Sequence, residues 1–513
     1  MMRRRVVAAI AIIGATMVSG CDKVVAPLET LPPLEPTSTD MSAGSWRMIL
    51  LSGPTQFAVA APAATNSPAY QAELVAIKAA QAALTNEQRA AIAYWSGGGV
   101  MRWNQILRGL VARYNLPPAP QNGGYPVPDA DNPFGDPAFP FANPVYAARA
   151  YSYVSAAQYD ALKAAWYWKA QYGRLSPARN DPSIAALAPL SELPSYPSEE
   201  GVISAVTVEM LKALFPAALQ EITLKAAEQR NVALWSGKAT ASDIAAGVAL
   251  GKSVAATFLA RASGDGMRNA VGTPAAWQAM ADSATARGDI AWSSREVPPR
   301  PPMLPLFGKV SAWMMTPDQV AADRPPPPPA TGSPQMKAEL ATVKNTVDHL
   351  TRAQYAIALK WNDGAGSYTP PGHWNGVALN YVRDAKMSEV RAARVFALLN
   401  VAMHDAGVGC WEAKYHYFNP RPTQLDPTIK TQIGLPNFPS YTSGHSTFSA
   451  AAASVLSYLF PNGTTDFETM RDEAGISRLY GGIHFPSDIA EGKAHGIRIA
   501  AHTLSFATSD GTQ

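Results

Sequence analysis

The chain has 513 residues, of which 47% are hydrophobic, so it is long enough for two domains or two packed halves. Its 42 Lys and Arg residues nearly balance 39 Asp and Glu residues, and the formal net charge is +3. Because no run of basic residues stands out, the composition argues against a nucleic-acid partner.

Residues 1–20 have the layout of a removable export signal, with three arginines, a short apolar stretch and small residues before Cys21. The ending VSGC resembles a bacterial lipobox, in which the cysteine becomes the lipidated first residue of the mature protein. Lipid on Cys21 would attach the protein to a membrane surface, with residues 21–46 as a tether. The alternative is an ordinary signal peptide followed by an incidental cysteine. No later run of about 20 apolar residues stands out, so we expect an exported, periplasmic, membrane-anchored lipoprotein.

The sequence contains an internal repeat. Residues 143–172 align with residues 388–417 at an offset of 245, and the same offset aligns the segments LPSYPSEEG and FPSYTSGHS. Further upstream, residues 72–95 align with residues 338–361 at an offset of 266. A shared offset over about a hundred residues indicates that the chain arose by duplication.

Both copies are expected to be helical, because Ala-rich windows carry apolar residues at spacings of three and four. The predicted fold class is therefore all-α, with two related helical bundles and the active site in the C-terminal one. We expect a degenerate N-terminal repeat at 47–265, a Pro-rich connector at 266–336 and a catalytic helical domain at 337–513.

Ionisable residues distinguish the two copies. All eight histidines lie in the second copy. At aligned positions, ionisable residues of the second copy face residues of a different kind in the first: Arg421 faces Ser176, His445 faces Glu200, Arg478 faces Ala233 and His484 faces Ala239. We interpret this pattern as a duplicated scaffold that keeps one working site.

Three short segments of the second copy carry the polar residues of this site. The first contains Lys414 and Arg421, the second is Ser443-Gly444-His445 before an Ala-rich helix, and the third contains Arg478, His484 and Asp488. Each alone has an ordinary explanation, such as a solvated face or a helix cap. Together, the cations, the histidines and the N-H groups at a helix start favour a pocket for a tetrahedral oxyanion.

These motifs, K-x6-RP, SGH and SR-x5-H-x3-D in this order, resemble the superfamily of type 2 phosphatidic acid phosphatases (PAP2), bacterial acid phosphatases and vanadium-dependent haloperoxidases. One departure is Thr442, where the family usually has proline before the serine. The length of the chain and its two helical bundles make it more similar to the haloperoxidases. In particular, Trp411 and Phe438 match aromatic positions beside the pocket of chloroperoxidase-like members.

The resemblance implies a role for each site residue. Vanadate would be bound through His484, which Asp488 orients, while Lys414, Arg421, Arg478, Ser443 and Gly444 hold the oxyanion and His445 acts as acid and base. The segment at 361–375 resembles a family segment whose aspartate pairs with the third-motif arginine, which nominates Asp363 as the partner of Arg478. Hydrogen peroxide and a halide would then be the substrates.

Two alternatives remain. In a PAP2-type acid phosphatase, the same pocket would bind a phosphoester without a cofactor, and His484 would form a phosphohistidine. In a non-catalytic envelope lipoprotein, the helices would be an interaction scaffold. The complete ionisable set of the second copy argues against the scaffold, because isolated charges are costly to retain in a pocket.

Overall fold

The computed structural model describes residues 30–116, 120, 122–125 and 144–512, and these residues form α-helices and short 3-10 helices but no β-strand. This confirms the predicted all-α fold. The helices before residue 290 are α1 (Pro68–Ala82), α2 (Asn86–Trp95), α3 (Gly99–Tyr114), α4 (Pro144–Tyr172), α5 (Pro177–Asn180), α6 (Glu199–Leu214), α7 (Leu219–Trp235), α8 (Ala241–Gly264) and α9 (Pro274–Ala286). The later helices are α10 (Pro317–Ala322), α11 (Pro334–Asp348), α12 (Arg352–Lys360), α13 (Thr369–Asp384), α14 (Glu389–Tyr417), α15 (Pro422–Leu425), α16 (Gly444–Leu459), α17 (Thr464–Tyr480) and α18 (Pro486–Ala507). The 3-10 helices are η1 (Met41–Ser45), η2 (Pro216–Ala218), η3 (Met267–Asn269), η4 (Phe307–Lys309) and η5 (Pro461–Gly463).

Equivalent helices of the two copies start with the same capping chemistry. At α2, the side chain of Thr85 accepts a hydrogen bond from the N-H of Gln88, whose side chain accepts one from the N-H of Thr85. Thr351 and Gln354 form the same capping box at α12, 266 residues later. A capping box satisfies N-H groups that the first turn of a helix leaves free. The sequence repeat therefore repeats a local folding signal.

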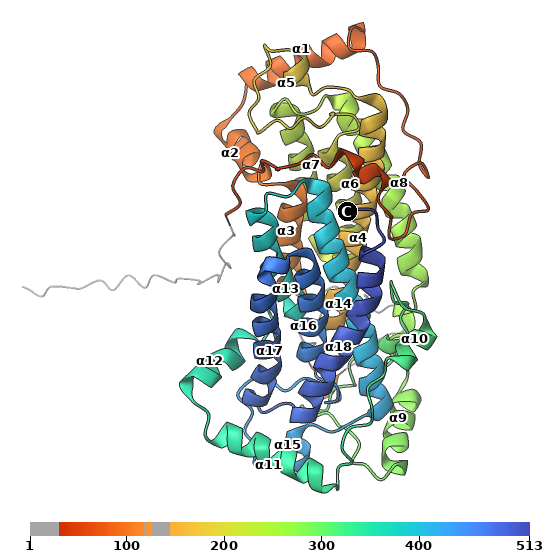
Figure 1. Ribbon diagram of the computed structural model, residues 1–513, viewed down its shortest axis with the longest axis vertical. Helices are drawn as coiled ribbons and strands as arrows, with labels where there is room; N and C mark the ends of the chain where they lie inside the picture. The colour runs from red at the N-terminus through yellow and green to blue at the C-terminus, as the bar shows by residue number, and fades with distance from the viewer. Residues whose placement is uncertain (1–29, 117–119, 121, 126–143, 513) are drawn as a thin grey trace, which may run out of the picture. The chain divides into compact units, whose positions relative to one another are not determined.

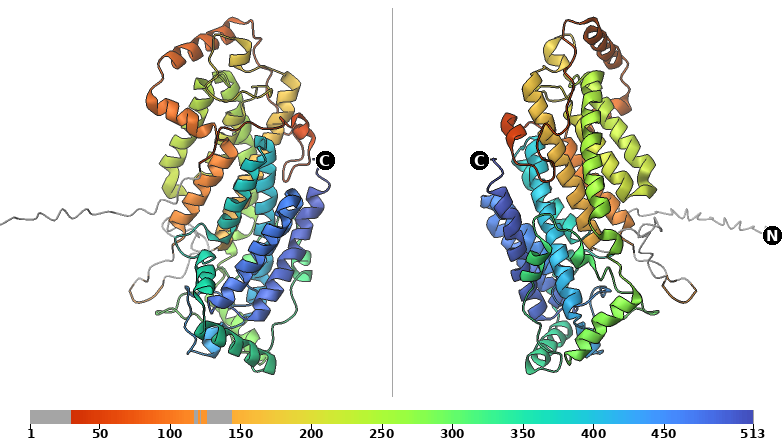
Figure 2. Two further views of the ribbon diagram at one scale, coloured as in Figure 1. Left: turned by 60° about the vertical axis from the view of Figure 1, so that its left-hand side comes forward. Right: turned by 90° about the vertical axis from the view of Figure 1, so that its right-hand side faces the viewer.

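Two similar sets of helices pack against one another. In the first set α6 contacts α4 and α8, and in the second α16 contacts α14 and α18 (Figure 1). The long helices α4 and α14 join the two sets, drawn in yellow to green and in cyan to blue in Figure 2. Buried apolar residues from Leu31 to Ala507 form one continuous cluster, so both copies share a core. The predicted domain limits remain a prediction.

The glycine of the repeated SDIA-x-G segment allows a close helix contact in both copies. A Cβ atom at Gly247 on α8 would lie 2.3 Å from the carbonyl oxygen of Ser198, and one at Gly492 on α18 would lie 2.8 Å from that of Ser443. Any larger residue would push these helices apart. The segment thus positions the start of α6 and of α16, which is a scaffold role.

One buried ion pair of the first copy is repeated in the second. Arg149 Nε lies 2.8 Å from Asp265 Oδ2, and Arg394 Nε lies 2.6 Å from Asp510 Oδ2. Both members of the second pair come 245 residues after those of the first. These repeated contacts support the interpretation that the chain is duplicated.

Two segments that the sequence analysis treats as spacers have more structure than expected. In the predicted tether, Asp40 is buried and accepts hydrogen bonds from Ser388 and Arg391, at the start of α14. The connector at 266–336 contains α9, η4 and α10. The signal segment and Cys21 lie outside the described residues, so export and lipidation remain predictions.

One segment of the described residues, Ala241–Asn269, has the length and apolar composition to cross a membrane. The sequence analysis singled out no such run in this part of the chain. The segment comprises α8 and η3, and α8 packs against α6 and α4 within the bundle. We therefore interpret it as a core helix.

The paired arginines give a test of the shared packing. Removing Arg394 leaves Asp510 buried without its cation, so we expect Arg394→Ala to lower the free energy of unfolding by about 3–5 kcal/mol. Arg149→Ala should cause a loss of similar size, since it leaves Asp265 in the same state. The measurement is urea unfolding followed by circular dichroism, with exposed Arg89→Ala as the control. If either buried substitution behaves like the control, that ion pair does not stabilise the helix set to which it belongs.

Candidate active site

The structure brings the three predicted motifs together at one end of the second helix set. Lys414 lies near the end of α14, Arg421 precedes α15, Ser443 caps α16, Arg478 lies in the last turn of α17, and Asp488 lies in the first turn of α18. His484 lies in the turn between α17 and α18. These residues are spread over 75 positions, and helix packing makes them neighbours.

Lys414 is fully buried and is held by backbone oxygens. Its Nζ donates to the carbonyls of Pro439 at 2.9 Å, Ser440 at 2.8 Å and Thr442 at 2.5 Å. Burial lowers the pKa of Lys414 to about 7. The ammonium group is therefore oriented by neutral acceptors, and its charge is not cancelled by an ion pair in the described part of the chain.

The two arginines are also buried and bound mainly to carbonyls. Arg421 donates through Nε to Phe438 O at 3.1 Å and through Nη1 to Ile483 O at 2.8 Å. Arg478 donates to the carbonyl of Trp361 and to the hydroxyl of Ser477. Burial lowers the pKa of Arg421 to about 10 and that of Arg478 to about 9, so both guanidinium groups stay charged at neutral pH.

His484 is held between an acid and a cation. Its Nδ1 lies 2.8 Å from Asp488 Oδ2, and its Nε2 lies 2.9 Å from Arg421 Nη1. Because a guanidinium can only donate, Nε2 must be the acceptor and Nδ1 must carry the proton. Burial and the charges of Arg421 and Lys414 hold the pKa of His484 well below its usual value. The imidazole is thus neutral, with the Nε2 lone pair on the side of the cations.

Asp488 is fixed by three donors on one oxygen. Besides His484, its Oδ2 accepts the hydroxyl of Ser440 at 2.5 Å and the N-H of Phe485 at 3.1 Å. Burial raises the pKa of Asp488 to about 6, so the carboxylate is ionised at neutral pH. Sequence analysis missed Ser440, because Ser195 occupies the aligned position in the first copy and made it look like scaffold.

The SGH motif forms the start of α16. Ser443 Oγ accepts the N-H of Ser446 at 3.3 Å, which leaves its own hydroxyl proton available. A Cβ atom at Gly444 would meet only Phe448 and Trp411, both at 3.9 Å, so the space before this residue is open. His445 Nε2 is buried without a hydrogen-bond partner among the described residues. Burial and then the charge of Arg478 hold the pKa of His445 well below its usual value.

The predicted ion pair between Asp363 and Arg478 is not formed. Both carboxylate oxygens of Asp363 lie 3.2 Å from His373 Nδ1, and Oδ2 lies 4.0 Å from His445 Nε2. The Arg478 guanidinium instead donates a hydrogen bond to the backbone carbonyl of Trp361. Asp363 acts on Arg478 only through its charge, which raises the arginine pKa against the larger effect of burial. Asp363 therefore faces the histidine side of the site.

A cavity of about 420 Å³ opens beside these groups, and the two predicted aromatic residues line it. The rings of Trp411 and Phe438 lie 4.9 Å apart. Phe438 also lies under two cations, since Lys414 Nζ and Arg421 Cζ are each 5.1 Å from its ring centroid. Arg478, His445 and His484 line the cavity together with the two aromatic residues, whereas Lys414 and Arg421 lie against the Phe438 ring and do not line it.

Sequence analysis also missed Arg300, which lines this cavity from the segment expected to be a spacer. Its Nη2 lies 2.8 Å from Glu296 Oε1, and its Nε is buried without a partner among the described residues. No motif includes it, so only the folded structure identifies it as a cavity residue.

The low pKa of Lys414 predicts how anion binding depends on pH. A lysine is charged below its pKa, so Lys414 carries its charge below about pH 7 and loses it above. We expect the Kd for sulfate, whose own charge stays constant, to rise from about pH 6 to about pH 9, by up to about tenfold per pH unit. Titration calorimetry measures this, with Lys414→Met as the control that removes the titrating group. An equal pH dependence in both proteins would show that Lys414 does not control anion binding.

Comparisons with known proteins find a matching family model and similar folds. Residues 394–510 match the model of the PAP2 superfamily. A comparison with curated proteins finds no match. The solved structure of a bacterial vanadium-dependent iodoperoxidase is similar, with 24% identity, a TM-score of 0.55, and coverage of 71% of this chain and 91% of that chain.

An apo-type and a holo-type bacterial vanadium-dependent chloroperoxidase are similar too, each with 14% identity. The apo-type structure gives a TM-score of 0.51 and covers 71% of this chain and 94% of its own. The holo-type structure gives a TM-score of 0.50 and covers 76% of this chain and 96% of its own. Residues 394–510 therefore carry a PAP2 superfamily domain, within the all-α fold of the vanadium-dependent haloperoxidases.

Proposed function

We propose that this protein is a vanadate-dependent haloperoxidase that oxidises halide with hydrogen peroxide. The observation that carries the proposal is the set of three buried cations, Lys414, Arg421 and Arg478, beside a neutral histidine. Among the described residues they bind backbone carbonyls, Ser477 and His484, and none forms an ion pair with a carboxylate. Buried charge without a counterion is costly, so this set fits a bound anion.

The residues around the cations fit a tetrahedral oxyanion such as vanadate. Lys414, Arg421 and Arg478 would balance its charge, the free proton of Ser443 and the N-H of Gly444 would donate to it, and His484 would bind it through Nε2. Bound vanadate would supply the centre at which hydrogen peroxide oxidises halide. The open space in front of Gly444 is consistent with this use of the site.

The protein's own contribution is to orient and to move protons. Asp488 and Ser440 hold the proton of His484 on Nδ1, which leaves the lone pair on Nε2. Arg421 Nη1 now donates to that lone pair, so a bound oxyanion would replace this hydrogen bond. His445 Nε2 is unpartnered and lies 4.0 Å from Asp363 Oδ2, so it can take a proton from an incoming peroxide and return it. Asp363 would stabilise the imidazolium that forms in between.

The aromatic wall is what favours haloperoxidase over phosphatase chemistry. Trp411 and Phe438 lie directly beside the cations, and an apolar wall suits a weakly hydrated halide and a planar organic acceptor. The similarity in fold to haloperoxidases adds support from an independent comparison. A phosphatase that used the same cations would need room for a leaving group at this wall.

A single preparation tests the proposal. The purified protein is incubated with orthovanadate and dialysed, and it is then given hydrogen peroxide, bromide and an activated phenol. We expect brominated phenol from the wild type and none from His484→Ala, because that variant lacks Nε2. Lys169→Ala, which changes the aligned lysine of the first copy, should keep full turnover. Circular dichroism checks that both variants are folded.

The same preparation can also contradict the proposal. Rapid release of phosphate from an aryl phosphate, suppressed by vanadate and without any brominated product, would make the protein a phosphatase. Wild-type turnover in His484→Ala would show that the assignment of His484 is wrong.

A further inference from the structure

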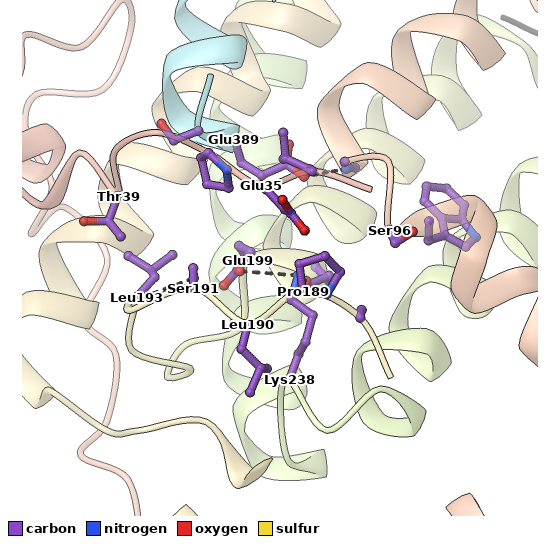
Figure 3. A pocket seen from close by; sticks show the side chains of 18 of the residues that line it. Glu35, Thr39, Ser96, Pro189, Leu190, Ser191, Leu193, Glu199, Lys238 and Glu389 are labelled. Atoms are coloured by element: carbon purple, nitrogen blue, oxygen red, sulfur yellow. Dashed lines mark hydrogen bonds and ion pairs between the residues drawn. The ribbon is translucent and has the colours of Figure 1, made fainter. Parts of the chain in front are cut away.

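A second cavity, of about 360 Å³, lies in the first helix set (Figure 3). Several of its lining residues come 245 positions before residues that line the candidate active site. The aligned pairs are Trp166 and Trp411, Leu193 and Phe438, Glu200 and His445, and Lys238 and Ile483. The duplicated scaffold therefore has a cavity at the same place in each copy.

The charges of this second cavity are reversed. Lys169 aligns with Lys414, but its Nζ lies 2.6 Å from Glu199 Oε2, so a carboxylate of the chain neutralises it. Lys238 forms an ion pair with Glu200. A charge-assisted pair is stronger than a neutral hydrogen bond, and both lysines already have one. An added anion would have to displace these carboxylates.

A third carboxylate has no cation of its own. Glu389 lines the cavity from the first turn of α14, and its oxygens accept the N-H groups of Gly99 at 2.5 Å and Val100 at 3.0 Å. Among the described residues it forms no ion pair. Burial disfavours the charged form of the Glu389 carboxylate and raises its pKa to about 7. A cation bound nearby would offset that cost. Figure 3 shows Glu389 and Glu199 at the same cavity.

The cavity also contains a buried donor without an acceptor. Gln229 is 1% exposed, and its Oε1 accepts the indole N-H of Trp103 at 2.7 Å, which fixes the orientation of the amide. Gln229 Nε2 then has no hydrogen-bond partner among the described residues. Both Gln229 and Gly99, whose added Cβ would lie 2.5 Å from this Nε2, line the cavity. A buried donor of this kind calls for an acceptor on a ligand.

We propose that the cavity of the first copy binds a small organic amine that also carries a hydroxyl or carbonyl oxygen. The ammonium group would pair with Glu389, while Glu200, which already pairs with Lys238, would add its negative charge nearby, and the oxygen would accept from Gln229 Nε2. The apolar body of the ligand would pack against Trp95 and Trp166, which line the cavity and are both nearly buried. This site is separate from the proposed peroxidase chemistry, and it does not depend on it.

Titration calorimetry with phenylalaninol tests the proposal, because this probe has an ammonium group, a hydroxyl and an aromatic ring. Its matched control is 3-phenylpropanol, which keeps the ring and the hydroxyl but lacks the amine. We expect saturable binding of phenylalaninol to the wild-type protein at near-neutral pH. The neutral alcohol should bind at least about tenfold more weakly, since charge-assisted bonds contribute more than neutral ones.

Variants assign the binding to this cavity. Glu389→Gln and Glu200→Gln keep the side-chain shape and remove one negative charge each, so each should raise the Kd for phenylalaninol at least about tenfold. Glu296→Gln, in the candidate active-site cavity, should leave the Kd unchanged. Thermal unfolding shows whether Glu389→Gln is folded. If it is not, the Kd of Glu200→Gln alone tests the proposal.

Three results would overturn the proposal. These are the absence of phenylalaninol binding, equal binding of the neutral alcohol, and a Kd that neither Glu200→Gln nor Glu389→Gln changes. Preferential binding of inorganic phosphate, lost in Lys169→Ala, would instead show that the first copy still holds an anion.

Discussion

The backbone of residues 438–442 is the part of the structure on which the candidate site depends. Its carbonyl oxygens accept hydrogen bonds from both Lys414 and Arg421, and Pro439 O accepts from both. Neutral carbonyls orient the two cations without cancelling their charge, as carboxylates would. The positive charge thus remains for a ligand. The same segment ends at the start of α16, so it also sets the position of Ser443 and Gly444.

The two copies show how one scaffold supports opposite electrostatics. The glycine contact and the buried Arg-Asp pair occur in both, whereas the groups around the aligned lysines differ. Lys414 faces carbonyls, and Lys169 faces the carboxylate of Glu199 as well as the carbonyl of Pro194. The same helix packing therefore surrounds two cavities with different charges.

Most of the helices and most of the candidate site residues could be predicted from the sequence. Alanine-rich periodicity predicted the helices, because that signal acts within a few residues. The offset of 245 singled out Arg421, Arg478 and His484 as residues without counterparts, and the structure brings them to one place. The spacing of four residues also predicted that Asp488 reaches His484 if the segment is helical there; the two are hydrogen-bonded, although His484 lies in the turn before α18.

The remaining features depend on contacts between distant segments. Asp363 has a positive φ of 42° and points to His373 rather than Arg478, which no local pattern indicates. Arg300 reaches the cavity from a proline-rich stretch whose path is fixed only by packing. Asp40 bonds to Arg391 at the start of α14, although the two are 351 positions apart, and η1 of the same segment packs against α4. Sequence patterns indicate local conformational preferences. They do not determine which distant residue a buried charged group contacts.

The central claim is that the second copy, and not the first, holds a tetrahedral oxyanion next to His484. A crystal structure of the protein soaked with orthovanadate tests it most directly. The account predicts vanadium density within bonding distance of His484 Nε2, surrounded by Lys414, Arg421 and Arg478, and no such density near Lys169. Vanadium bound beside Glu199, or a cation set in the second copy that stays without an anion at saturating orthovanadate, would contradict it.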